Sequence, residues 1–89
     1  MERIDMRSEA LAELLPSAAT ATMLYEMGLM YCSGPVGTHD YVTAHKWFNL
    51  AALKGSPEAK LQRCELAREM TPAEVHEAQR QARAWLTLH

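Results

Sequence analysis

Three side chains of the kinds that bind metal ions lie close together in the sequence, namely Cys32, His39 and His45. Zinc binds thiolate and imidazole groups in tetrahedral geometry, so these side chains could form a metal- or redox-sensing site around one loop. The spacing argues against such a site, because His39 and His45 flank a predicted helix start and no HxxxH or CxxC pair occurs. The simpler prediction places His39 in a solvated loop and His45 on a helix surface, with His76 and His89 also in solvent. A metal site is therefore a distant alternative.

Two pairs of glutamates could supply paired carboxylates for general acid–base chemistry. The members of each pair share a predicted helix face: Glu65 with Glu69, and Glu74 with Glu77. Arginines stand nearby at positions 63, 68, 80 and 83, so we interpret these carboxylates as solvated surface ion pairs. No nucleophile is paired with a base in a known motif, and the loop from Gly34 to Gly37 lacks the Lys-Ser/Thr ending of a phosphate loop. We expect no enzymatic activity and no cofactor.

The bulk properties exclude two classes of partner and indicate one small domain. The chain has 89 residues, of which 48% are hydrophobic, and a net charge of −2, which leaves no basic field for nucleic acid. No apolar run reaches the roughly 18 to 20 residues of a membrane span, and the first residues do not resemble a signal peptide, so we expect a cytoplasmic protein. Cys32 and Cys64 are too few for a disulfide scaffold and are predicted to be buried or half-buried free thiols.

The spacing of apolar residues predicts helices, and no segment alternates as a strand does, so we expect an all-α fold. Residues 1–16 read as an N-terminal arm or short helix that Pro16 ends, and residues 17–89 as the main helical domain. The next predicted helix, residues 17–32, has Leu24, Met27, Gly28 and Tyr31 on one face. Gly28 costs about 1 kcal/mol in a helix interior, so we expect a close contact with another helix to compensate.

The stretch from Asp40 to Gly55 is the most clearly bounded helix. Asp40 can cap its start, and Gly55 can adopt the left-handed conformation that closes a helix. One face combines rings with alanines, which lets a neighbouring helix approach closely, with Trp47 at its edge: Tyr41, Ala44, Phe48, Ala51 and Ala52.

Two further helices follow tight turns. Ser56-Pro57 is a cap followed by proline at the first helical position, and Thr71-Pro72-Ala73-Glu74 is a capping box. Their predicted buried faces are Ala59, Arg63, Leu66, Ala67 and Met70 in the first, and Val75, Ala78, Ala82, Trp85 and Leu86 in the second. The short turns predict that successive helices fold back as hairpins.

From Leu24 to Ala59 the chain resembles a Sel1-like repeat, a relative of the tetratricopeptide repeat. Ten positions match the family pattern in order: Gly28, Tyr31, Gly34, Asp40, Ala44, Trp47, Ala51, Ala52, Gly55 and Ala59. The chain departs from the pattern at Gly34-Pro35-Val36-Gly37, where the family usually has Gly-x-Gly-Val, at Met23, where it has alanine, and at Arg63-Cys64, where it has Leu-Gly. The resemblance implies antiparallel hairpins stacked as a short right-handed α-α superhelix, with about one full repeat and a divergent capping hairpin.

The resemblance also implies an adaptor or scaffold role, often in bacterial signalling or in assembling larger complexes, with a protein or peptide bound on the concave face. First helices of the repeats form that face, which here predicts four partner-binding residues: Thr22, Tyr25, Leu29 and Cys32. Two alternatives stay open. These residues could instead be buried against the N-terminal helix, and the apolar faces could form a homodimer. We interpret Met23, Met27 and Met30 as core filling.

Overall fold

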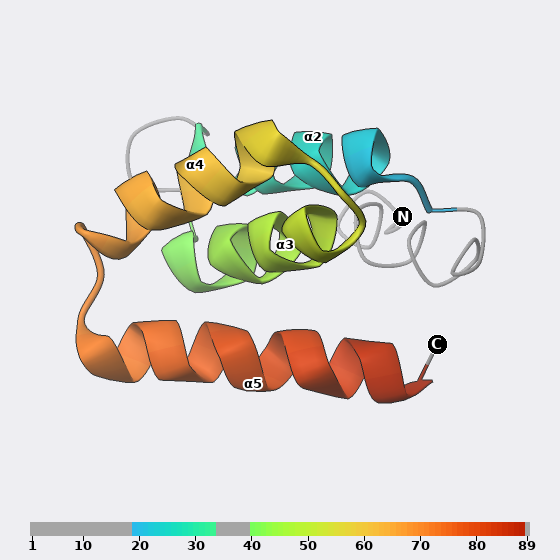
Figure 1. Ribbon diagram of the computed structural model, residues 1–89. Coiled ribbons are helices and arrows are strands. Elements are labelled where there is room, and N and C mark those ends of the chain that lie inside the picture. Colours follow the sequence, from blue (N-terminus) through green and yellow to red (C-terminus); the bar gives the residue numbers. More distant parts are fainter. Residues whose placement is uncertain (1–18, 34–39, 89) are drawn as a thin grey trace, which may run out of the picture.

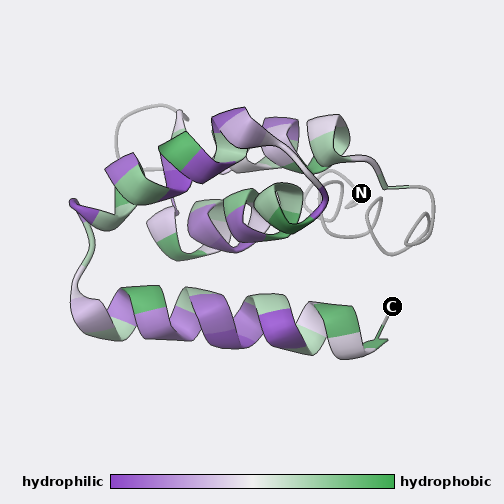
Figure 2. Ribbon diagram, in the orientation of Figure 1, coloured by the Kyte–Doolittle hydropathy of each residue, from purple (hydrophilic) through white to green (hydrophobic). Residues whose placement is uncertain are grey.

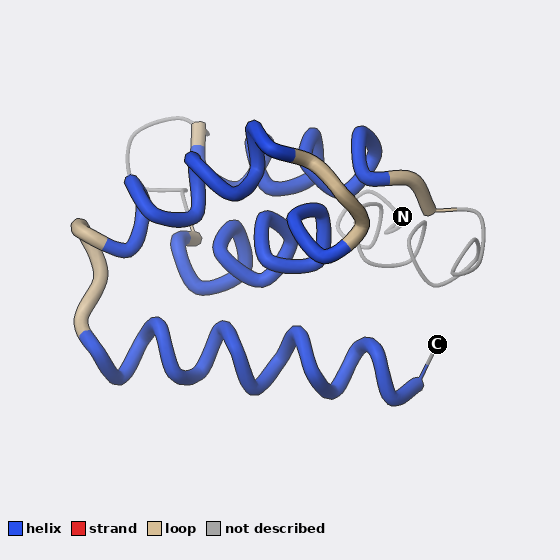
Figure 3. Tube along the Cα trace, viewed as in Figure 1, coloured by secondary structure: helices blue, strands red, loops and turns tan. Residues whose placement is uncertain are grey.

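The computed structural model describes residues 19–33 and 40–88, which contain helices and turns but no strand (Figures 1 and 3). The helices are α2 (Ala21–Cys32), α3 (Tyr41–Leu53), α4 (Pro57–Ala67) and α5 (Pro72–Leu88). The all-α prediction is therefore confirmed for this part of the chain. The predicted N-terminal helix, Gly34, His39 and His89 lie outside the described residues.

Helix α3 begins and ends at the predicted signals. The Asp40 carboxylate accepts hydrogen bonds from the Thr43 N–H at 3.1 Å and from the Thr43 hydroxyl at 2.7 Å, which satisfies a free donor at the helix start. Gly55 has a φ of 107°, a conformation that glycine adopts without the steric cost a side chain brings. Both predicted signals are confirmed.

The starts of α4 and α5 also use the predicted caps. The Ser56 hydroxyl accepts from the Ala59 N–H at 3.0 Å, with Pro57 at the first helical position. At α5 the Thr71 hydroxyl accepts from the Glu74 N–H at 3.1 Å, while the Glu74 carboxylate accepts from the Thr71 N–H at 2.8 Å. This reciprocal pair is the capping box that the sequence predicts.

Helix α3 is the common neighbour of the other three described helices. Helices α2, α4 and α5 each pack against it, whereas α4 and α5 make few direct contacts with each other. In Figure 1, α2 and α4 lie on one side of α3 and run opposite to it, and α5 lies on the other side and runs parallel to it. The last two helices therefore fold back as predicted, but α5 packs on α3 and not on α4.

The core is built around α3, whose side chains are buried on most of its circumference. Its fully or almost fully buried apolar residues are Ala44, Trp47, Phe48, Leu50 and Ala51. Helix α2 approaches closely at Gly28, where an added Cβ would stand 2.5 Å from two ring carbons of Phe48. The predicted close contact at Gly28 is confirmed, and its neighbour is an aromatic ring.

Helix α5 contacts α3 through an inner face of small residues and one tryptophan. Ala78 and Ala82 are buried, and the Trp85 ring meets the Trp47 ring edge to face, with centroids 5.9 Å apart and planes at 80°. The prediction that Leu86 belongs to this face is wrong, because 45% of Leu86 is exposed. Only one side of α5 is covered, namely the side that packs against α3, so Leu86, the residue after Trp85, faces solvent.

Candidate functional site

The outer face of α2 is the first candidate site, and its orientation is fixed by contacts on the inner side. Leu24 and Gly28 are buried, and the Thr20 hydroxyl caps the helix by accepting from the Met23 N–H at 3.1 Å. The Lys54 ammonium donates to the Ala19 carbonyl at 3.0 Å, which joins the approach to α2 to the end of α3. These contacts leave the opposite side of α2 facing away from α3.

Two methionines are the most exposed apolar side chains of α2. Met23 is 39% exposed and Met30 is 55% exposed, with the exposed Glu26 between them. We call these three residues the α2 outer stripe. The prediction that the methionines fill the core is wrong for Met23 and Met30, because both side chains are exposed and lie away from the buried Leu24 and Gly28. Met27, one turn from Leu24, does pack against the core.

The four residues predicted to bind a partner lie beside this stripe. Thr22 is exposed, whereas Tyr25, Leu29 and Cys32 are half-buried and pack against the core. The Tyr25 ring contacts Phe48, with centroids 5.8 Å apart and a tilt of 42°. Burial raises the pKa of the Cys32 thiol, which keeps it protonated and weakly nucleophilic at neutral pH. The structure thus places these residues together on one flank of α2, partly open to solvent.

The predicted metal ligands do not form a described cluster. His39 lies outside the described residues, and within residues 19–33 and 40–88 no three His, Cys, Asp or Glu side chains are grouped as metal ligands. The prediction that His45 is a surface residue is wrong, because only 2% of it is exposed. It is buried because α3 is covered on several sides, which a pattern within one helix does not show. Cys32 is half-buried as predicted, but the same prediction for Cys64 is wrong, because Cys64 is exposed.

His45 lies in a buried polar region between α3 and α4. Burial first, and the nearby positive charge of Arg63 second, lower the pKa of the imidazole below its ordinary value. Arg63 also donates to the Asn49 side-chain oxygen at 2.7 Å, and no described residue forms a hydrogen bond with Nδ1 of His45. His45 is therefore neutral at pH 7, and Arg63 packs along the interface instead of joining a surface ion pair.

The glutamates occupy exposed or half-exposed positions. Glu77 accepts two hydrogen bonds from Arg80, at 2.7 and 2.9 Å, and Glu65 lies 3.8 Å from Arg68. The hydrogen bonds from Arg80, and then from Gln81, lower the pKa of Glu77 to about 2. An acid of that strength is ionised at neutral pH and cannot supply a proton to a reaction. These two contacts agree with the surface ion pairs predicted from the sequence.

A depression of about 420 Å³ lies between α3 and α5. Its lining consists of Thr43, Lys46, Arg80, Gln81, Ala84, Trp85 and Leu88. The polar lining groups already have internal contacts: the Thr43 hydroxyl with Asp40, Arg80 and Gln81 with Glu77, and the Lys46 ammonium 4.3 Å from the centroid of the Trp47 ring. With these groups engaged, the depression offers little specific recognition to a ligand.

Comparison with known proteins adds no relative. No protein-family model matches the chain, and neither the curated proteins nor the solved structures include a match. None of the helices within residues 19–33 and 40–88 is long and apolar enough to cross a bilayer. The resemblance to a Sel1-like repeat accordingly stays a prediction based on the ten matching positions.

Proposed function

We propose that the chain is a protein-interaction module, an adaptor or scaffold, that binds a partner protein or peptide along the outer face of α2. The supporting observation is the composition of that helix. Its 12 residues include one charged residue, Glu26, although Met23, Glu26 and Met30 face solvent. A helix covered on one side only normally has a polar outer face, and an exposed apolar surface is typical of a contact site. Methionine suits such a surface because it adapts to different partners.

The arrangement of the helices supports the same proposal. Helices α2 and α4 run in the same direction on one side of α3, and α3 and α5 run parallel to each other (Figure 1). This is the order expected for first and second helices of consecutive Sel1-like hairpins, whose first helices would form the concave face. Leu61 of α4 is also exposed, so the proposed surface has apolar residues on both first helices. We include Leu61 in the contact surface.

Site-specific cross-linking tests this function. A photoreactive residue in place of Met30 is compared with the same residue in place of Gln79, which is exposed on α5. We expect discrete protein adducts from position 30 that disappear when Met23→Asp is added, and none of these adducts from position 79. If both positions yield the same adducts, or position 30 yields none, the α2 surface does not bind a partner.

A second candidate function is a self-associating structural subunit. The observation that favours it is a group of exposed leucines at helix C-terminal ends, namely Leu53, Leu86 and Leu88. The ends of α3 and α5 lie at the same side of the molecule in Figure 1. Sedimentation velocity over a concentration series tests it: a dimer that Leu88→Asp dissociates supports this function, and a monomer at all concentrations excludes it.

A further inference from the structure

The α2 outer stripe has the spacing of a helix–helix seam. Met23, Glu26 and Met30 are separated by three and four residues, so they form one line along the exposed side of the helix. The same three-and-four spacing brings side chains of two helices into register along a coiled-coil seam. Helix α2 has 12 residues and is about 18 Å long, which matches about three turns of a second helix.

Glu26 is the polar position of this seam. It is exposed, it is the only charged residue in α2, and it has no ion-pair or hydrogen-bond partner among the described residues. When a helix covers the stripe, the carboxylate loses water, and this is unfavourable unless a cation or donor faces it. A polar residue within an apolar seam also selects among partners and fixes their register.

The position of Glu26 argues against a second copy of the chain as the occupant. Glu26 lies near the middle of α2, so a twofold contact centred on this helix would bring two carboxylates together. Like charges facing each other at an interface are unfavourable, and the net charge of −2 adds to the repulsion between copies. The same charges favour the approach of a basic segment.

We propose that the occupant of the α2 face is an amphipathic helix of another protein, with a lysine or arginine at its centre between apolar residues. This inference rests on the proposed function, since it assumes that the face binds a protein. The basic residue pairs with Glu26, and the apolar residues on either side contact Met23 and Met30. Half-buried Leu29 and Tyr25 lie along one flank of the same contact.

A displayed library of helical peptides of about 20 residues tests the inference. Each peptide has leucines at the outer seam positions, and the central seam position is randomised to all residue types. The library is selected on wild-type protein and on three variants. Glu26→Lys reverses the charge, Met30→Asp disrupts the face, and Gln79→Asp places the same new charge on α5 as a control. We expect lysine and arginine to be enriched at the centre on wild type and Gln79→Asp, and aspartate and glutamate on Glu26→Lys. Replacing the central lysine of one selected peptide by glutamate should weaken its binding to wild type about tenfold and strengthen its binding to Glu26→Lys about tenfold.

The outcomes separate the inference from the function on which it rests. If Met30→Asp abolishes binding of the selected peptides but their central charge does not reverse on Glu26→Lys, the inference is wrong and the proposed function stands. If no selected helix depends on Met30, both are wrong. A wild-type dimer in sedimentation that Met30→Asp dissociates also overturns the inference, because a second copy then occupies the face.

Discussion

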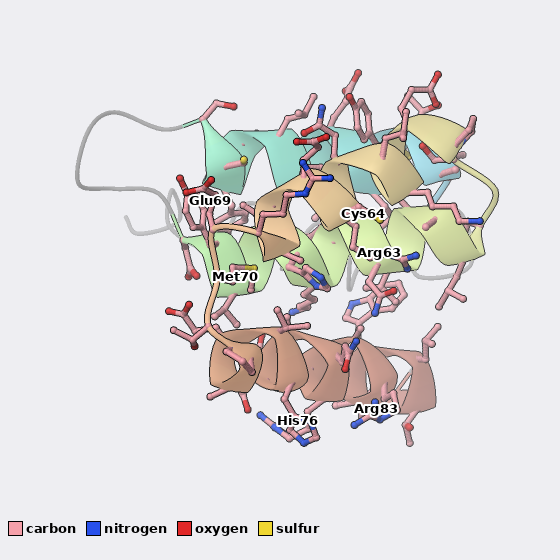
Figure 4. All side chains as sticks on the ribbon, turned by 60° about the vertical axis from the view of Figure 1, so that its left-hand side comes forward. Arg63, Cys64, Glu69, Met70, His76 and Arg83 are labelled. Carbon is pink, nitrogen blue, oxygen red and sulfur yellow. The ribbon has the colours of Figure 1, made fainter. Side chains whose placement is uncertain are left out.

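Helices α2 and α5 both pack against α3, yet their outer faces differ. The outer side of α5 is polar: His76 and Arg83 extend away from the other helices in Figure 4, and hydrophilic residues dominate the middle of α5 in Figure 2. The outer side of α2 has Met23 and Met30 on either side of Glu26. Since the two helices meet the same neighbour, packing against α3 does not explain the difference.

The inner faces of these helices contain the buried core residues and should determine stability, whereas we propose that the α2 outer face is a contact site. An exposed methionine gains little from folding, and a charged residue in its place would improve solubility. We propose that a contact with another molecule accounts for the two methionines of the α2 outer stripe.

The inner face of α5 should give the largest effect. Trp85→Ala removes a buried ring that packs on Trp47, and we expect the free energy of unfolding to fall by about 4 kcal/mol. Urea denaturation followed by circular dichroism measures this loss. Arg83→Ala on the outer side of α5 is the control, with an expected change within about 0.5 kcal/mol. Similar losses in both variants would show that the two faces of α5 are wrongly assigned.

The inner face of α2 should be almost as sensitive. In Gly28→Leu the new Cβ alone lies 2.5 Å from two Phe48 ring carbons, so α2 must move away from α3. We expect a loss of about 3 kcal/mol, measured as a lowered midpoint of thermal unfolding. The matched control is Thr22→Leu, which adds the same side chain to the exposed side of the same helix and should change stability by less than about 0.5 kcal/mol. A stable Gly28→Leu variant would contradict the close approach of the two helices.

A smaller effect should come from the α3–α4 interface as the pH falls. Unfolded His45 binds a proton near pH 6.5, whereas folded His45 does so only at lower pH, because burial and Arg63 lower its pKa. The free energy of unfolding should therefore fall as the pH drops below about 6.5 and level off below the folded pKa. Glu77 contributes only in the more acidic range between 4.5 and about 2.

Chemical denaturation at a series of pH values measures this dependence, and His45→Gln is the control. The glutamine cannot take up a proton, so the variant should lose the slope that begins near pH 6.5. An unchanged slope in His45→Gln would assign the pH dependence to another group.

The outer faces should give the smallest change in stability and the largest difference in binding. Met30→Asp and Gln79→Asp each add one negative charge to an exposed helix position, and each should alter the free energy of unfolding by about 0.5 kcal/mol or less. Cross-linking from Leu61 of α4 should detect a partner in Gln79→Asp and none in Met30→Asp. Equal adducts in the two variants would remove the functional distinction between α2 and α5.

The sequence predicts the starts of α3, α4 and α5 correctly because local chemistry determines them. The predicted start of the preceding helix at residue 17 is wrong, because residues 19 and 20 are not helical and α2 begins at Ala21, after the Thr20 cap. Asp40, Ser56 and Thr71 each hydrogen-bond to a backbone N–H three residues later, and Gly55 has the conformation that its position requires. The all-α class follows from these signals and from the spacing of apolar residues. Each of these interactions lies within a few residues of the chain, so one sequence is enough to identify it.

The errors concern side chains whose environment depends on distant segments. His45 is buried because α4 covers that side of α3, and Leu86 is exposed because α5 contacts α3 and few residues of α4. The sequence alone places Met23 and Met30 in the core, because residue type does not distinguish a buried methionine from an exposed one. Periodicity within one helix indicates a buried face but not how many neighbours cover the helix.

The central place of α3 has a consequence for how the molecule opens. Because α2, α4 and α5 all depend on this helix, neither hairpin can detach while the other keeps a complete core. Amide protons of α3 should exchange with solvent at a common, slowest rate, set by global unfolding. A chain divided at the Gly55 turn should yield two fragments that are unfolded when separate and regain helical structure only when mixed.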